Sequence, residues 1–173
     1  SNTYALAGAK LLFRNIQAAY ENPDDMEAKN KMLLGAYYGG IAITGSGTTA
    51  VHALSYPLGG KYHIPHGVSN AILFAHVMDF NRSACETELA ELCDEVYPEL
   101  SGKSVGEKSC YIIQKIAEIV KTTNIPTDLS QFGITAEDLD FLVEAGSQQT
   151  RLLVNNKQEL SKDDIREIYK KVL

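Results

Sequence analysis

The chain has 173 residues, with 16 Lys and Arg against 22 Asp and Glu, which gives a formal net charge of −6 at pH 7. Its 45% hydrophobic and 22% charged residues are typical of a globular protein and exclude a disordered or fibrous chain. The chain has no run of Lys and Arg, so nucleic acid and anionic membranes are poor partners. Gly, Ser or a charge interrupts every long apolar stretch, which excludes a transmembrane helix, and no signal peptide is visible.

Apolar residues recur at three- and four-residue steps along nearly the whole chain, which predicts helices. The first predicted helix runs from residue 3 to about residue 21 and ends at Pro23. The second runs from about residue 25 to 43 and ends in a run of small residues that includes Gly39, Gly40, Gly45 and Gly47. Its predicted apolar face consists of Met32, Leu33, Ala36 and Tyr37.

Two shorter helices are expected next. Residues 48–56 form the first, which Pro57 should end, and Gly59 and Gly60 then form a turn. Pro65 suits the first turn of the following helix, which runs to about Phe80.

The rest of the chain predicts helices over residues 86–96 and 104–123. Two further helices begin at the capping signals Thr135–Asp138 and Ser161–Asp164. No alternating strand pattern with hairpin turns is present. The sequence therefore predicts an all-α fold, a helical bundle-like domain, and residues 1–173 are expected to form a single helical domain.

The four histidines, His52, His63, His66 and His76, lie within 25 residues of one another in a glycine-rich window. Histidine is a common metal ligand and the side chain that titrates nearest to neutral pH. His52 and His66 lie on consecutive predicted helices with two glycines between them, so both imidazoles can face one point. Two imidazoles suit Zn²⁺ or Fe²⁺ but are too few for a complete site. From spacing alone, hydrogen-bonded core or surface histidines are an equally good interpretation.

The other two histidines fit other positions. His63 cannot share a continuous helix with His66 because Pro65 lies between them, so His63 is a candidate pocket-wall residue. His76 lies in the middle of a predicted helix, where a packing role is favoured. Cys85, Cys93 and Cys110 have no CxxC spacing, which indicates a reduced, cytoplasmic compartment and no disulfides.

The window from Gly39 to Asn81 carries the order VHALSYPLGG, a short spacer, PHG and SNAILFAHVMDFN. In this order it resembles the iron-containing (group III metal-dependent) alcohol dehydrogenase family. The resemblance extends over nearly the whole chain, from the first 13 residues to RLLVNNKQELSKDDIREIY at 151–169, but only as the family's C-terminal helical domain. It implies the helical part of a dehydroquinate synthase-like two-domain enzyme, whose N-terminal nucleotide-binding α/β domain is absent from this chain.

The resemblance also implies a site. The family binds a divalent metal through one Asp and three His, and the last two His match His52 and His66. The Asp and the first His come from a helix upstream of residue 1, so this chain would hold no complete site for Fe²⁺ (or Zn²⁺) and NAD(P). Many members carry another His where this chain has Tyr56. A phenol donates a hydrogen bond but, with an ordinary pKa near 10, is a poor base at neutral pH. Proton release would then pass through water, ribose hydroxyls or His63, which leaves Tyr56 and His63 as the candidate catalytic residues.

The function implied for the intact enzyme is reversible hydride transfer between a nicotinamide cofactor and a small alcohol or aldehyde, with the isolated chain inactive. Alternatives are a fragment of a zinc enzyme like glycerol dehydrogenase or dehydroquinate synthase, or a helical interaction module without catalysis. A reductase specific for lactaldehyde, a diol, a hydroxy acid or a phosphonoaldehyde is a further alternative. The sequence leaves the metal, the choice of NAD or NADP, the substrate and a homo-oligomer open.

Overall fold

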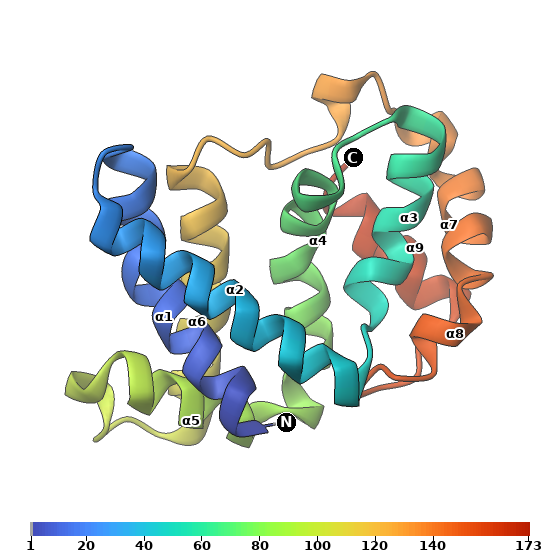
Figure 1. Cartoon of the computed structure of the whole chain (residues 1–173). Coiled ribbons are helices and arrows are strands. Elements are labelled where there is room, and N and C mark those ends of the chain that lie inside the picture. Colours follow the sequence, from blue (N-terminus) through green and yellow to red (C-terminus); the bar gives the residue numbers. More distant parts are fainter. Residues whose placement is uncertain (1) are drawn as a thin grey trace. The chain divides into compact units, whose positions relative to one another are not determined.

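The computed structural model describes residues 2–173, and helices are the only regular elements in that range (Figure 1). This confirms the all-α prediction. The α-helices are α1 (Asn2–Glu21), α2 (Met26–Ser46), α3 (Ala50–Tyr62), α4 (His66–Asn81), α5 (Glu86–Val96), α6 (Val105–Thr122), α7 (Leu139–Ser147), α8 (Thr150–Leu153) and α9 (Lys162–Lys170). Four short 3₁₀ turns cover Arg82–Ala84, Pro98–Leu100, Ser130–Phe132 and Ala136–Asp138. The helical periodicity of the sequence predicts every α-helix in this range except the four-residue α8.

The chain divides into two compact units. Unit 1 contains residues 2–47 and 85–115, and unit 2 contains residues 48–84 and 116–173. None of the helices over residues 2–173 has the length and apolar character needed to cross a membrane.

In unit 1, α1 and α2 approach each other through glycines. A Cβ atom on Gly8 would lie 2.9 Å from the carbonyl oxygen of Gly35, which is closer than real Cβ contacts. Helix α5 is tied to α1 by polar contacts: Lys10 pairs with Glu95 at 2.7 Å, and Arg14 donates to the Glu95 carbonyl at 2.8 Å. The Arg14 contact places a cation at the C-terminal end of α5, where the helix dipole favours it.

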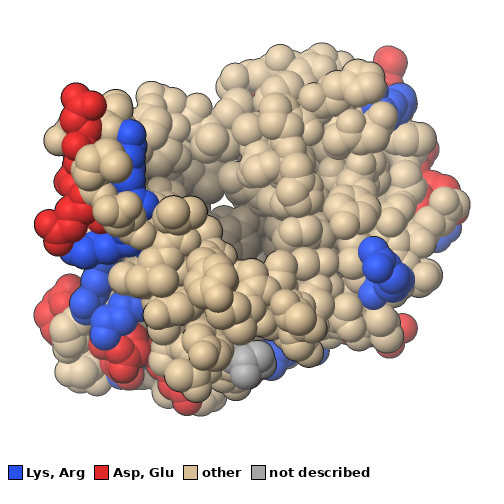
Figure 2. All heavy atoms as spheres, viewed as in Figure 1, with Lys and Arg blue, Asp and Glu red and all other residues tan. Residues whose placement is uncertain are grey.

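The predicted apolar face of α2 is wrong. Leu33 and Tyr37 are 72% and 64% exposed, and the buried residues of α2 are Ala28, Gly35 and Ala42. The small residues form the contact face because they let the two backbones come close, and the large side chains are left outside. Residues 32–46 contain no charged side chain, and the middle of α2 is uncharged in the view of Figure 2.

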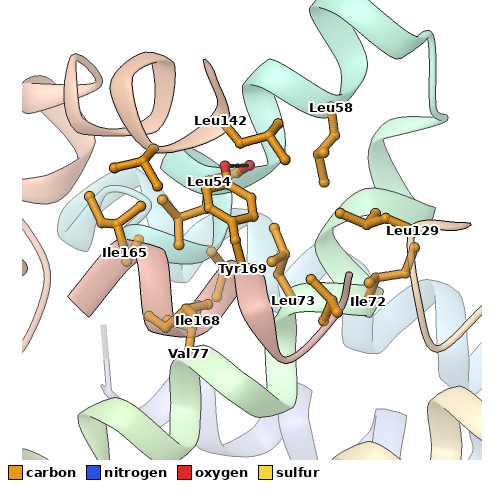
Figure 3. Packing of buried hydrophobic residues seen from close by; sticks show 14 of the residues in the cluster. Leu54, Leu58, Ile72, Leu73, Val77, Leu129, Leu142, Ile165, Ile168 and Tyr169 are labelled. Atoms are coloured by element: carbon orange, nitrogen blue, oxygen red, sulfur yellow. Dashed lines mark hydrogen bonds between the residues drawn. The ribbon is translucent and has the colours of Figure 1, made fainter. Parts of the chain in front are cut away.

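Unit 2 is built around large apolar side chains from α3, α4, α7 and α9 (Figure 3). Leu54, Leu73, Leu142 and Ile165 are completely buried there. Tyr169 of α9 is also completely buried, and its hydroxyl donates a 2.6 Å hydrogen bond to the carbonyl of Leu54 (Figure 3). Burial raises the pKa of Tyr169 far above its usual range, so this hydroxyl keeps its proton and remains a donor.

Helix α3 does not end at Pro57, as the sequence predicted, but continues through Gly59 and Gly60 to Tyr62. Pro57 has no N–H and cannot bond to the carbonyl of Ala53. Its ring is buried, as are Ala53, Leu54 and Leu58, so packing on this stretch of the helix offsets the lost hydrogen bond.

The chain reverses instead at His63, which has a left-handed backbone with φ 56°. The N–H of His63 donates to the carbonyl of Gly59, and the N–H of Ile64 donates to that of Leu58. These bonds to carbonyls near the end of α3, together with the left-handed residue, are typical of a helix end of the Schellman type. The turn between the two histidine-bearing helices is therefore residues 63–65 rather than the two glycines.

Three helix starts carry reciprocal side-chain caps. The predicted capping signals at Thr135–Asp138 and Ser161–Asp164 are both confirmed. A third, Ser104–Glu107 before α6, was missed, although Ser followed three residues later by Glu is the stronger form of the signal. Hydrogen bonds from the backbone N–H and hydroxyl of Ser104 lower the pKa of Glu107 to about 2.

Candidate metal centre

Two neighbouring helices of unit 2 form the candidate site. His52 and Tyr56 lie four residues apart on α3, and His66 and Asn70 lie four residues apart on α4. Because side chains at i and i+4 share one face of a helix, each helix presents a pair of polar side chains in one direction. The turn at residues 63–65 brings the two helices together in an antiparallel pair.

The structure brings His52 and His66 together. Their ring centroids are 5.1 Å apart, and the ring planes are inclined by 55°. Two imidazoles that bind one tetrahedral metal through nitrogens about 2.0–2.1 Å away have ring centroids roughly 5 Å apart. The residues present therefore fit a shared cation, and His52 and His66 are the side chains that could hold it. The same separation is typical of two rings in simple contact, so their role as ligands stays a prediction.

The start of α3, and with it His52, is fixed by the segment that follows α8. The N-cap residue Thr49 makes no side-chain cap, and the N–H of Ala50 donates instead to Asn156 Oδ1 at 3.5 Å. Asn156 and the buried Asn81 of α4 exchange two amide hydrogen bonds, at 2.9 and 2.7 Å. This amide pair links the first turn of α3 to the last turn of α4.

His52 is half-buried, whereas His66 is exposed. Burial, and to a smaller extent the nearby His66, lower the pKa of His52 below its usual value of 6.5. The neutral imidazole is therefore favoured at neutral pH, and only the neutral ring offers a lone pair to a metal.

Tyr56 lies beside this pair, with its ring centroid 6.2 Å from that of His66. Its side chain is 40% exposed. The phenol is therefore an exposed neighbour of the His66 imidazole.

The other two histidines are not part of this group. His63 caps the end of α3 through its backbone and has an exposed side chain, and the structure records no ring contact between it and the others among residues 2–173. His76 is half-buried on α4, where burial and the nearby Lys171 lower its pKa and Asp79 opposes the shift. Within the described range, no three His, Cys, Asp or Glu side chains converge as a metal site would require.

Asn70 is a further polar residue of this group that is not among the predicted site residues. Its amide nitrogen lies 2.9 Å from His66 Nε2, and its amide oxygen is buried without a hydrogen-bond partner. The spacing of four residues from His66, within PHGVSN, was the signal that could have identified it.

Comparisons with known proteins give the chain its family. The family model for the C-terminal part of the Fe-containing alcohol dehydrogenase family matches residues 1–173. The long-chain-alcohol dehydrogenase 1 of Geobacillus thermodenitrificans is 36% identical over 169 residues, which are 98% of this chain and 43% of that protein. The lactaldehyde reductase of Escherichia coli K12 is 30% identical over 145 residues, which are 84% of this chain and 38% of that protein.

Solved structures agree with this assignment. A crystal structure of 1,3-propanediol oxidoreductase superimposes with a TM-score of 0.93 at 24% identity, over 99% of this chain and 44% of that one, which shows a shared fold. Sulfoacetaldehyde reductase from Bifidobacterium kashiwanohense, solved in complex with NAD⁺, has a TM-score of 0.83 at 25% identity and covers 98% and 43%. The chain spans less than half the length of these relatives. The chain therefore belongs to the iron-containing alcohol dehydrogenase family and corresponds to its C-terminal, all-helical part.

Proposed function

We propose that this chain is the metal- and substrate-binding part of an alcohol dehydrogenase or aldehyde reductase that uses NAD(P) and a divalent metal, Fe²⁺ or Zn²⁺. The observation that carries the proposal is the 5.1 Å separation of the His52 and His66 rings on two helices that a tight turn holds together. The remaining ligands and the cofactor domain would lie outside residues 1–173. We place the enzyme in the cytoplasm, because its cysteines lack the pattern of a disulfide framework.

Each residue of the site has a proposed role. His52 and His66 would hold the metal, which when bound acts as a Lewis acid toward the substrate oxygen. Tyr56, an exposed neighbour of His66, would donate a hydrogen bond to the substrate. His63 would accept a proton near the turn between α3 and α4, while its backbone holds that turn.

Substitutions separate these roles when they are made in the natural protein that carries this chain. His52→Ala or His66→Ala should remove most of the bound metal and the turnover. Tyr56→Phe and His63→Asn should keep the metal and lower turnover, because each removes a proposed proton donor or acceptor and leaves both ligands in place. Asn suits position 63 because it tolerates the left-handed backbone there. Unchanged metal content in both histidine-to-alanine variants would contradict the proposal.

The isolated chain gives a second test. With two of four ligands and no cofactor domain, it should not oxidise NADH when Fe²⁺ or Zn²⁺ and a short aldehyde are added. Measurable NADH oxidation would overturn the proposal that the chain is inactive alone. The gene upstream of residue 1 should encode an Asp-x-x-x-His helix and a glycine-rich cofactor turn.

The substrate needs its own experiment. Two of the relatives are named for substrates as different as long-chain alcohols and lactaldehyde. Turnover of the natural protein with short alcohols, diols, hydroxy acids and aldehydes would identify the class, and activity toward glycerol or a dehydroquinate precursor would favour the zinc-enzyme alternative. A protein that binds no metal would favour the non-catalytic interaction module.

A further inference from the structure

The side-chain amide of Asn70 contacts Nε2 of His66. Asn70 Nδ2 and His66 Nε2 are 2.9 Å apart, and the two residues are one helical turn apart on α4. An amide nitrogen carries only hydrogens and can only donate. His66 Nε2 must therefore accept, so the hydrogen of the neutral ring is on Nδ1.

The other end of the same amide is unsatisfied. Asn70 Oδ1 is buried and has no hydrogen-bond partner among the residues that the structure describes. A buried acceptor without a donor destabilises the folded protein. An apolar side chain of the same size would not carry this cost. The hydrogen bond to His66 is therefore the interaction that an amide, and not an apolar side chain, provides at position 70.

We propose that Asn70 is a positioning residue that holds His66 in the tautomer with hydrogen on Nδ1 and a lone pair on Nε2. This inference rests on the proposed function, because the lone pair on Nε2 is what a metal ion needs from the ring. In the metal-free protein the Asn70 amide occupies that lone pair and fixes the ring plane. An arriving cation takes the place of the amide hydrogen and finds the ring already in the required form.

Nitrogen-15 NMR of the imidazoles in the metal-free chain tests the proposal directly, at a pH where the rings are neutral. His66 should show a protonated Nδ1 and an unprotonated Nε2. In Asn70→Leu, which has a similar volume but no donor, His66 should shift toward protonated Nε2, and the Tm should not fall. Asn70→Asp, which can only accept, should give protonated Nε2. His76, which lies outside the histidine pair, is the internal control and should keep its signals in both variants.

Two results would overturn the proposal: a wild-type His66 already protonated on Nε2, or the same His66 signals in the wild type and both variants. A Zn²⁺ titration of the wild type then separates this inference from the metal assignment. Zn²⁺ should shift the nitrogen-15 signal of His66 Nε2 and break the hydrogen bond between that nitrogen and the Asn70 amide, which changes the Asn70 side-chain NH₂ signals. If the metal-free tautomer is as expected but Zn²⁺ leaves His66 unchanged, the proposal for Asn70 holds and the metal site fails.

Discussion

Units 1 and 2 of this chain are packed by different means. In unit 1 the helices α1 and α2 meet through Gly8 and Gly35, and large side chains such as Leu33 and Tyr37 remain outside. In unit 2 large side chains such as Leu142 fill a buried core, and the histidine pair lies on two of its helices. The comparison teaches that an apolar side chain stabilises a helix pair only when the backbones leave room for it, and that close backbones need glycine instead.

The largest expected effect comes from comparing a buried leucine of unit 2 with an exposed leucine of unit 1. Leu142→Ala in unit 2 should lower the free energy of unfolding by about 2–5 kcal/mol, because it leaves a cavity in the core. Leu33→Ala in unit 1 should change it by less than about 0.5 kcal/mol, because Leu33 is 72% exposed. Urea unfolding of both variants measures the difference, and equal losses would contradict the description of unit 1.

Two glycines of unit 1 should respond in opposite directions. Gly8→Ala should destabilise by about 1–3 kcal/mol, because the new methyl group meets the Gly35 carbonyl 2.9 Å away. Gly40→Ala on α2 has open space around the new methyl group and should stabilise the helix by up to about 1 kcal/mol. Hydrogen exchange of the α1 and α2 amides measures both changes within unit 1. A neutral Gly8→Ala would show that the helices do not depend on this close contact.

A smaller effect is expected from the buried hydroxyl of unit 2. Tyr169→Phe removes the donor to the Leu54 carbonyl and should cost about 1 kcal/mol. Tyr37→Phe in unit 1 is the matched control, since Tyr37 is 64% exposed, and should be neutral. Thermal unfolding followed by circular dichroism compares the two, and an equal change in both would contradict the role given to Tyr169.

The smallest expected effect is a change in how the stability of unit 2 depends on pH. Burial lowers the pKa of His76 in unit 2, so the folded state binds its proton less readily than the unfolded state. The stability that depends on neutral His76 is therefore complete above the ordinary pKa of 6.5 and is lost as the pH falls below it. His76→Gln should make the unfolding free energy of unit 2 less sensitive to pH just below neutrality. An unchanged slope of unfolding free energy against pH would contradict this assignment.

Local signals in the sequence were sufficient where neighbouring residues decide the structure. The caps at Thr135 and Ser161 follow from three-residue spacing, and the helical periodicity located nearly all of the helices. Long-range packing decided the rest. Pro57 is tolerated inside α3 because its ring and its neighbours are buried, and the contact face of α2 consists of small residues that carry no hydrophobic signal.

The site shows the same division. The sequence pointed to His52 and His66 as a ligand pair through the family resemblance, since spacing alone left core or surface histidines equally good, and their role as ligands stays a prediction. Asn70 and Asn156 could not be chosen in this way, because the role of an amide depends on the atom that it contacts in the folded chain. Asn156 meets Asn81 and the start of α3 across 75 residues or more of sequence, a contact that no short motif reveals.

The most direct test of the account is a Co²⁺ or Zn²⁺ titration of the 173-residue chain by calorimetry, with three single variants. The wild type should bind one ion weakly, and His52→Ala and His66→Ala should each abolish that binding, because a single imidazole remains. His76→Ala should bind like the wild type, because His76 lies outside the pair. Equal binding by all four proteins, or a loss only in His76→Ala, would contradict the claim that His52 and His66 hold one shared cation.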